Sequence, residues 1–101
     1  MRFAGQRVVI TGPLTTAEEF DEIARVADLV RESGGFPVWA GDIAGPIEAE
    51  FASVAELAEV EARILQGADF IIAMPGWEDS PHAFMDVLTA EQAGAELVEI
   101  G

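Results

Sequence analysis

Short hydrophobic runs recur along the chain and are separated by longer, more polar segments. Four of these runs have the length of buried or half-buried strands and are rich in valine, isoleucine and phenylalanine. Glycine or proline follows each of the first three runs and ends the predicted strand. The predicted strands span residues 7–11, 36–40, 70–74 and 96–100.

Three helices are predicted between these strands. Thr16 and Ser53 each begin a capping-box pattern, with a glutamate three residues later. Apolar residues then recur at helical spacing over residues 20–30 behind the first cap and over residues 57–65 behind the second. Ser80-Pro81 begins the third helix, because serine is a favoured N-cap and proline fits the first helical position.

Strands that alternate with helices favour a parallel sheet with helices on both faces. We therefore predict one α/β domain over residues 1–101, a three-layer, doubly wound, Rossmann- or flavodoxin-like sheet of four strands in the order 2-1-3-4. Pro37 predicts an edge position for the second strand, and alternating acids predict one for the last. The order also places a switch point between the first and third strands, and ligands bind at such points, outside the carboxyl ends of the strands.

The composition excludes several classes of site and partner. The chain has no cysteine and one histidine, His82, so thiol nucleophiles, disulfides and multi-histidine metal sites are excluded, and we expect no metal and no cofactor. A net charge of −14 repels DNA, RNA and anionic membranes. No apolar run has the length of a membrane span or a signal peptide. We expect a soluble, cytoplasmic protein.

The segment from residue 73 to residue 86 is the strongest candidate for a functional site. It turns from a strand through Pro75-Gly76 into the helix that begins at Ser80, which leaves backbone N–H donors at one mouth of the sheet. Asp86 lies about a turn and a half into that helix, and its side chain leans back toward the mouth. Residues 12–16, after the first strand, are expected to flank the same crevice.

Two motifs resemble the nucleoside 2-deoxyribosyltransferase superfamily, in particular its small, mostly uncharacterised members. One is the hydrophobic strand followed by Gly12-Pro13, and the other is residues 75–80, which match the Pro-Gly-Trp-Glu-x-Ser stretch of those members. The resemblance runs from Val8 to about Ile100. It implies an enzyme that hydrolyses or exchanges the N-glycosidic bond of a nucleoside or nucleotide, with a small molecule as partner. Family members are usually dimers or larger, so we expect a homodimer.

The resemblance also implies roles for individual residues. The family nucleophile is a helix glutamate six residues after a serine, and these positions hold Asp86 and Ser80 here. A second family carboxylate falls at Glu61, eight residues before the aspartate of Ala68-Asp69. His82 replaces a family glycine and is a candidate general acid or stacking surface. The expected substrate-binding residues are Gly12, Pro13, Thr15, Gly76, Trp77 and Ser80.

Each candidate also has a purely structural interpretation. Ser80 is a helix cap, and Asp86 and Glu61 are typical of solvated helix faces. Trp77 and Trp39 could stack on a base, but tryptophans in such positions are more often core or interface residues. No arginine lies in either motif, so a neutral nucleoside suits the site at least as well as a nucleotide. Two other functions stay open: an inactive module that binds a nucleotide-like ligand, and an acidic scaffold for protein interactions.

Overall fold

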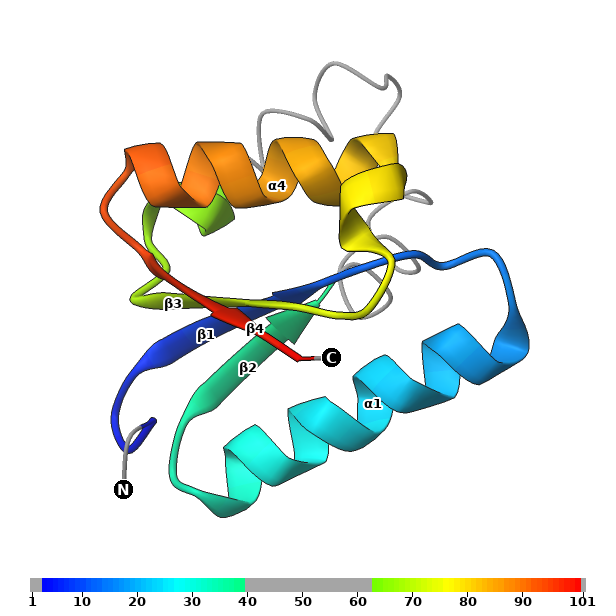
Figure 1. The fold of residues 1–101 in the computed structure, drawn as a ribbon. Coiled ribbons are helices and arrows are strands. Elements are labelled where there is room, and N and C mark those ends of the chain that lie inside the picture. Colours follow the sequence, from blue (N-terminus) through cyan, green and yellow to red (C-terminus); the bar gives the residue numbers. More distant parts are fainter. Residues whose placement is uncertain (1–2, 40–62, 101) are drawn as a thin grey trace, which may run out of the picture.

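The computed structural model describes residues 3–39 and 63–100 and contains a parallel sheet of four strands (Figure 1). The strand order is β2-β1-β3-β4, and every neighbouring pair is parallel, which confirms the predicted order. β2 and β4 lie at the two edges, as Pro37 and the acidic pattern of the last strand predicted. The strands are β1 (Arg7–Thr11), β2 (Phe36–Trp39), β3 (Phe70–Ala73) and β4 (Glu96–Glu99).

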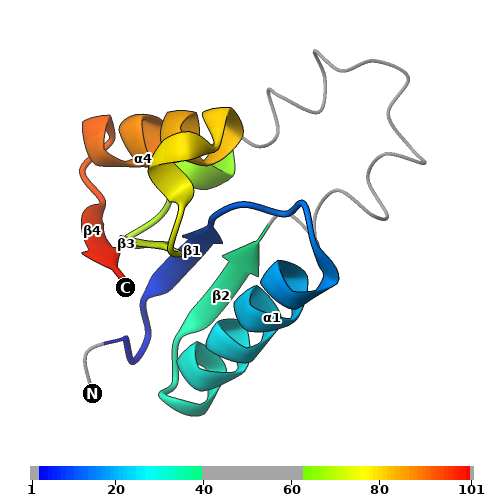
Figure 2. The same ribbon diagram turned by 45° about the vertical axis from the view of Figure 1, so that its right-hand side comes forward.

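Helices cover both faces of the sheet, which confirms the predicted three layers. Helix α1 (Ala17–Glu32) lies on one face, beside β1 and β2 (Figure 2). Helix α4 (Pro81–Gln92) and the short 3-10 helix η1 (Trp77–Asp79) lie on the other face. The helix predicted to begin at Ser53 falls mostly outside the described residues, but residues 63–66 are helical.

The starts of α1 and α4 differ in how their free N–H groups are satisfied. Thr16 caps α1 through a complete capping box, in which its side chain accepts from the N–H of Glu19 at 3.1 Å and a Glu19 oxygen accepts from the N–H of Thr16 at 3.0 Å. Ser80 occupies the N-cap of α4 and Pro81 its first turn, as predicted, but the Ser80 side chain makes no capping bond. The fixed backbone of Pro81 therefore contributes to the start of α4 where a capping hydroxyl does not.

The core has one part on each face of the sheet. The part under α1 is built from both central strands and from the apolar stripe of α1, and includes Ile10, Ile23 and Ile72. The part under α4 includes Ile71, Val87 and Ala90. Because side chains alternate across a strand, Ile71 and Ile72 fill opposite parts of the core, which is typical of a central parallel strand.

The chain leaves β1 and β3 in opposite directions, and this divergence creates the crevice at the switch point. The N–H of Met74 donates to the carbonyl of Thr11 at 2.9 Å, so the two strands stay paired to their ends. A Cβ on Gly12 would lie 2.6 Å from the Cβ of Met74, closer than real Cβ atoms approach. Glycine at position 12 thus lets the first loop cross the end of β3 closely.

Candidate active site

A hollow of about 440 Å³ lies at the carboxyl ends of β1 and β3, at the predicted switch point. It is formed by the loop after β1 and by the start of α4 with the turn before it. Four of the predicted substrate-binding residues, together with His82, meet here although residues 15 and 76 are far apart in sequence. The lining residues are Pro13, Leu14, Thr15, Gly76, Asp79, Ser80, Pro81 and His82.

Asp86 is held against the end of β1 and does not point into bulk water. Its Oδ2 accepts a hydrogen bond of 2.8 Å from the hydroxyl of Thr11, which is 4% exposed. Asp86 itself is half-buried on α4. Asp86 is not itself a lining residue of the hollow, but His82, one helical turn before it, is, and its partner Thr11 directly precedes the Gly12-Pro13 turn. The carboxylate therefore lies at the end of β1, one helical turn from a residue that lines the hollow.

Burial raises the pKa of Asp86 above its ordinary value, because removal of water disfavours the charged form. The hydrogen bond from Thr11 and the charge of His82 act in the opposite direction and offset part of this effect. A carboxylate that is partly desolvated and held by one oxygen has the character of a positioned reactive group.

Ser80 and His82 form a pair at the rim of the hollow. The Oγ of Ser80 lies 3.1 Å from Nδ1 of His82, and the tautomer of the ring decides which atom donates. This contact explains why the Ser80 hydroxyl does not cap α4, because its oxygen faces the ring two residues later. His82 and Asp86 are four residues apart on one helix, so their side chains lie on neighbouring turns.

The first loop is braced by Glu19 of α1. One oxygen of Glu19 accepts from the N–H of Thr15 at 2.9 Å, from its hydroxyl at 2.7 Å and from the N–H of Thr16. The hydroxyl and N–H of Thr15 hold the pKa of Glu19 below its ordinary value. Thr15 lines the hollow, but its hydroxyl already donates to Glu19, so it contacts a ligand only by accepting or by giving up that bond.

Gly76 and Pro13 lie close together at the hollow because position 76 has a backbone conformation and a clearance that suit glycine. Gly76 has φ of 86°, in the left-handed region that favours glycine, and a Cβ there would lie 3.2 Å from Cγ of Pro13. With Gly12 against Met74, both predicted glycines are needed for the two turns. Their contribution to the site is to bring the two loops close together.

Trp39 and Trp77 differ in how much of the ring is exposed and so could contact a ligand. Trp39 is 6% exposed and packs edge-to-face on Phe20 with ring centroids 4.7 Å apart, so it is part of the core. Trp77 is half-buried and stacks on Phe84, with centroids 6.0 Å apart and an interplanar angle of 17°. It does not line the hollow. Its visible role is to pack η1 against α4.

Two residues of the site were not singled out from the sequence as candidates. Thr11 donates a hydrogen bond to Asp86. The sequence feature that could have indicated this role is a hydroxyl at the end of an otherwise apolar strand. Asp79 lines the hollow and gives it an acidic side chain. Glu61, the other predicted carboxylate, lies outside the described residues. No lysine or arginine is among the lining residues of this hollow.

The fold and the site together define a doubly wound, flavodoxin-like α/β domain with a carboxylate at its switch point. The fold is similar to that of a 2-deoxyribosyltransferase from the psychrotolerant bacterium Bacillus psychrosaccharolyticus, with a TM-score of 0.77 and 13% sequence identity over 92% of this chain and 70% of that chain. At this identity the similarity establishes the fold. No family model and no curated protein matches the sequence.

No helix among residues 3–39 and 63–100 is both long and apolar enough to cross a membrane.

Proposed function

We propose that this protein acts on the N-glycosidic bond of a nucleoside, with Asp86 as the nucleophile. The observation that carries the proposal is the position of Asp86, half-buried, held by Thr11 at the end of β1 and one helical turn from His82, which lines the hollow. The fold shared with a 2-deoxyribosyltransferase and the two sequence motifs support the same chemistry. Membership of that superfamily is part of the proposal.

The charge of the hollow favours a neutral nucleoside over a nucleotide. Asp79 lines the hollow, and none of its lining residues is lysine or arginine. A phosphate dianion would face this carboxylate with His82 as the one cationic group among the lining residues. The volume of about 440 Å³ is within the range of small-molecule sites.

The proposed reaction has two steps that return the enzyme to its starting state. Thr11 holds Oδ2 of Asp86, so we assign attack on the anomeric carbon to Oδ1. The C–O bond forms, the C–N bond breaks, and the departing base takes the bonding electrons and a proton from His82. Water then attacks the sugar ester, its proton passes to His82, and the Asp86 carboxylate leaves. With a second nucleobase in place of water, the product is a new nucleoside.

The proposal is tested by measuring release of free base from a panel of 2′-deoxynucleosides and ribonucleosides, and of their 5′-monophosphates, by liquid chromatography. Base release is expected from at least one nucleoside and is expected to disappear in Asp86→Ala. Glu91→Gln removes another acid of α4 that does not line the hollow and is the matched control, with unchanged activity expected. Addition of a second base distinguishes transfer from hydrolysis. No base release from any compound would overturn the proposal.

A second function, ligand binding without catalysis, is favoured by one observation. His82 stands where the resembling family has glycine, and its ring lines the hollow next to Ser80. A ring in this place narrows the site for a sugar. In that case nucleosides raise the melting temperature without release of base, and Asp86→Ala leaves this stabilisation unchanged.

A further inference from the structure

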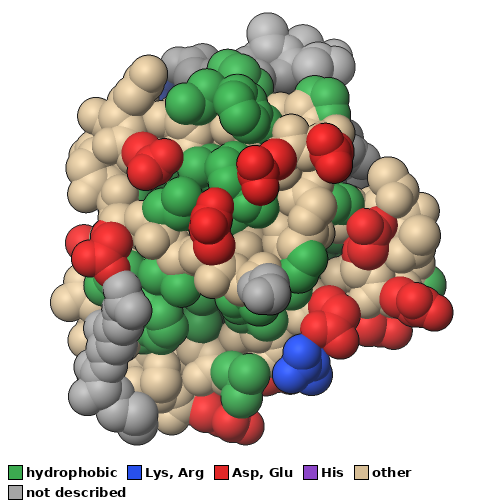
Figure 3. All heavy atoms as spheres, viewed as in Figure 1, with side chains coloured by type: hydrophobic (Ala, Val, Ile, Leu, Met, Phe, Trp, Pro, Cys, Tyr) green, Lys and Arg blue, Asp and Glu red, His purple; other side chains and the backbone are tan. Residues whose placement is uncertain are grey.

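A second depression, which is apolar, lies on the face of the sheet that α1 covers, between α1 and β4. One part of it, of about 280 Å³, has a floor that includes Val30 and Ile72, which are buried, and walls that include Leu29 and Ile100. Leu29 is 53% exposed and Ile100 is 37% exposed. Figure 3 shows this side of the molecule, where hydrophobic side chains gather between α4 and α1 and acidic side chains border them.

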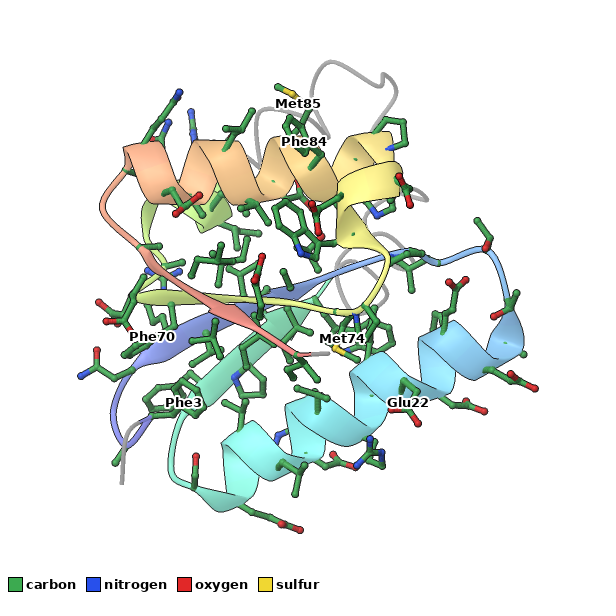
Figure 4. All side chains as sticks on the ribbon, viewed as in Figure 1. Phe3, Glu22, Phe70, Met74, Phe84 and Met85 are labelled. Atoms are coloured by element: carbon green, nitrogen blue, oxygen red, sulfur yellow. The ribbon has the colours of Figure 1, made fainter. Side chains whose placement is uncertain are left out.

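The depression continues toward the carboxyl ends of the strands. Ile100 also lines a neighbouring hollow of about 520 Å³, whose apolar surface includes Met74. The N–H of Ile100 donates to the carbonyl of Ala73 at 3.1 Å, so this residue extends the β3–β4 pairing and joins the two hollows. Figure 4 shows Phe3 near the beginning of the depression and Met74 at its other end, above α1. We name the two hollows together the α1–β4 groove.

The groove exists because α1 covers only part of its face of the sheet. Strands of a parallel sheet are normally buried on both faces by helices. α1 packs beside β1 and β2, whereas β3 and β4 present Ile72 and Val98 to the same face with no described helix directly over them. A helix alongside α1 is the kind of element that normally covers this part of a parallel sheet.

The charge around the groove determines what kind of helix fits. Glu18, Glu19 and Glu22 of α1 line its wider part, and none of the residues that line either hollow is basic. The ion pair with Arg25 at 2.6 Å offsets the charge of Glu22, and Glu18 and Glu19 leave the rim with a net negative charge. Glu22 is labelled on α1 in Figure 4.

We propose that the α1–β4 groove binds a cationic amphipathic helix of a partner protein. Its apolar stripe would cover Leu29 and Ile100, and its basic side chains would pair with the glutamates of α1. This inference does not depend on the proposed reaction, because the groove and the candidate active site lie on different sides of the first loop and share only Pro13.

The charge balance of the chain argues against the two nearest alternatives. A second copy carries a net charge of −14 and would bring further carboxylates to the rim. Residues 40–62 contain acidic side chains and no basic ones, so this segment of the chain is no better a complement to the glutamates. A partner helix with lysine or arginine flanking an apolar stripe complements both the apolar floor and the acidic rim of the groove.

The experiment uses three fluorescent helical peptides of about 18 residues, or five turns. They share one leucine stripe and carry lysine, glutamine or glutamate on the polar face. Fluorescence anisotropy with the full chain is expected to give a dissociation constant for the lysine peptide about tenfold or more below that of the glutamine peptide at low salt, and weaker discrimination at high salt. The glutamate peptide is expected not to bind.

Matched variants locate the binding surface. Leu29→Glu places a charge on the wall of the groove, whereas Met85→Glu places one at a similarly exposed apolar residue, 58% exposed, that points away from the sheet on α4 (Figure 4). Affinity for the lysine peptide is expected to fall about tenfold or more in the first variant and to be unchanged in the second. Glu18→Gln is expected to weaken binding, and Glu91→Gln on α4 is expected to have no effect.

Three kinds of result would overturn the proposal. The first is a failure of discrimination, which is either equal loss of peptide binding in the two charge variants or equal affinity for the three peptides. The second is a dimer in light scattering that dissociates in Leu29→Glu, which would make a second copy the occupant. The third is the absence of binding of the lysine peptide. In that case a much larger loss of thermal stability in Leu29→Glu than in Met85→Glu would indicate that the chain covers its own groove.

Discussion

The hydroxyl of Thr11 and the carboxylate of Asp86 are joined by a hydrogen bond of 2.8 Å across 75 positions of sequence. The bond connects the end of the first strand to the second turn of α4 and crosses the switch point. It fixes one oxygen of a partly desolvated acid and orients the side chain before any ligand is present. Such preorganisation is what a nucleophile requires, because a group that is already in place needs no further ordering during the reaction.

The contribution of this bond to stability is measurable in a double-mutant cycle of Thr11→Val and Asp86→Ala. Loss of the hydroxyl leaves a half-buried carboxylate without its partner, which we expect to cost about 1–2 kcal/mol in the free energy of unfolding. Because the two residues touch, the costs are expected to be non-additive, with a coupling energy of similar size. Urea unfolding of the four proteins at neutral pH gives this number, and strictly additive costs would show that the bond contributes nothing.

The raised pKa of Asp86 predicts a particular dependence of stability on pH. The folded state holds the proton of Asp86 more strongly than the unfolded state does, so the charged form is the less favourable one in the fold. As the pH rises from the ordinary aspartate value of about 4 through the raised value, wild-type protein loses stability from this group. Asp86→Asn removes that loss. The variant is expected to gain stability relative to wild type over this interval and to keep a constant difference above it.

Thermal or urea unfolding of wild type and Asp86→Asn between acidic and neutral pH tests this sign, and Asp79→Asn at the exposed rim is the control. A difference that favours wild type increasingly as the pH rises would contradict the prediction.

The rate of the proposed reaction is expected to depend on pH through the same group, because only the ionised form of Asp86 attacks. Base release is therefore expected to increase with pH through the raised pKa.

Thr16 and Ser80, both predicted from the sequence as N-cap residues, are expected to respond differently to alanine. Thr16 makes a complete capping box, so Thr16→Ala is expected to lower the free energy of unfolding by about 1 kcal/mol. The side chain of Ser80 makes no capping bond and faces His82, so Ser80→Ala is expected to cost only a few tenths of that amount. Urea unfolding measures both, and equal costs would mean that the Ser80 hydroxyl caps α4 in solution.

The sequence predicted the strands, the described helices and the strand order because these depend on local patterns. Hydrophobic runs and capping residues act within a few positions, and alternation of strands with helices leaves few topologies. Ser80 shows the limit of such patterns, since its position at the N-cap was predicted correctly and the partner of its hydroxyl was not. A neighbouring ring nitrogen competed successfully with the helix N–H groups.

The candidate site was predicted only in part, because local patterns encode its turns but not the contacts between distant elements. Turn residues placed Pro13 and Gly76 at the mouth of the sheet, where both line the hollow. Helical spacing directed Asp86 toward that mouth, and the structure places it at the end of β1 against Thr11. The contact between Thr11 and Asp86 depends on how closely α4 packs over the end of β1, which no local pattern encodes. Trp77 was expected at the substrate from a motif; the structure stacks it on Phe84, and a contact with substrate stays a prediction. The expected homodimer stays a prediction, for which light scattering gives the mass in solution.

The aspartate at position 86 gives a last prediction, which separates the geometry of this site from that of the family it resembles. Asp86→Glu restores the family's residue but lengthens the side chain by one methylene, so the carboxylate no longer fits the 2.8 Å contact with Thr11. If the site is organised around aspartate, base release is expected to fall about a hundredfold, as for a reacting group displaced by about 1 Å. The rate is measured on the nucleoside that wild type cleaves, with Glu91→Gln as the control. Equal or faster release from Asp86→Glu would show that Thr11 does not position the nucleophile and that the longer side chain suits this fold.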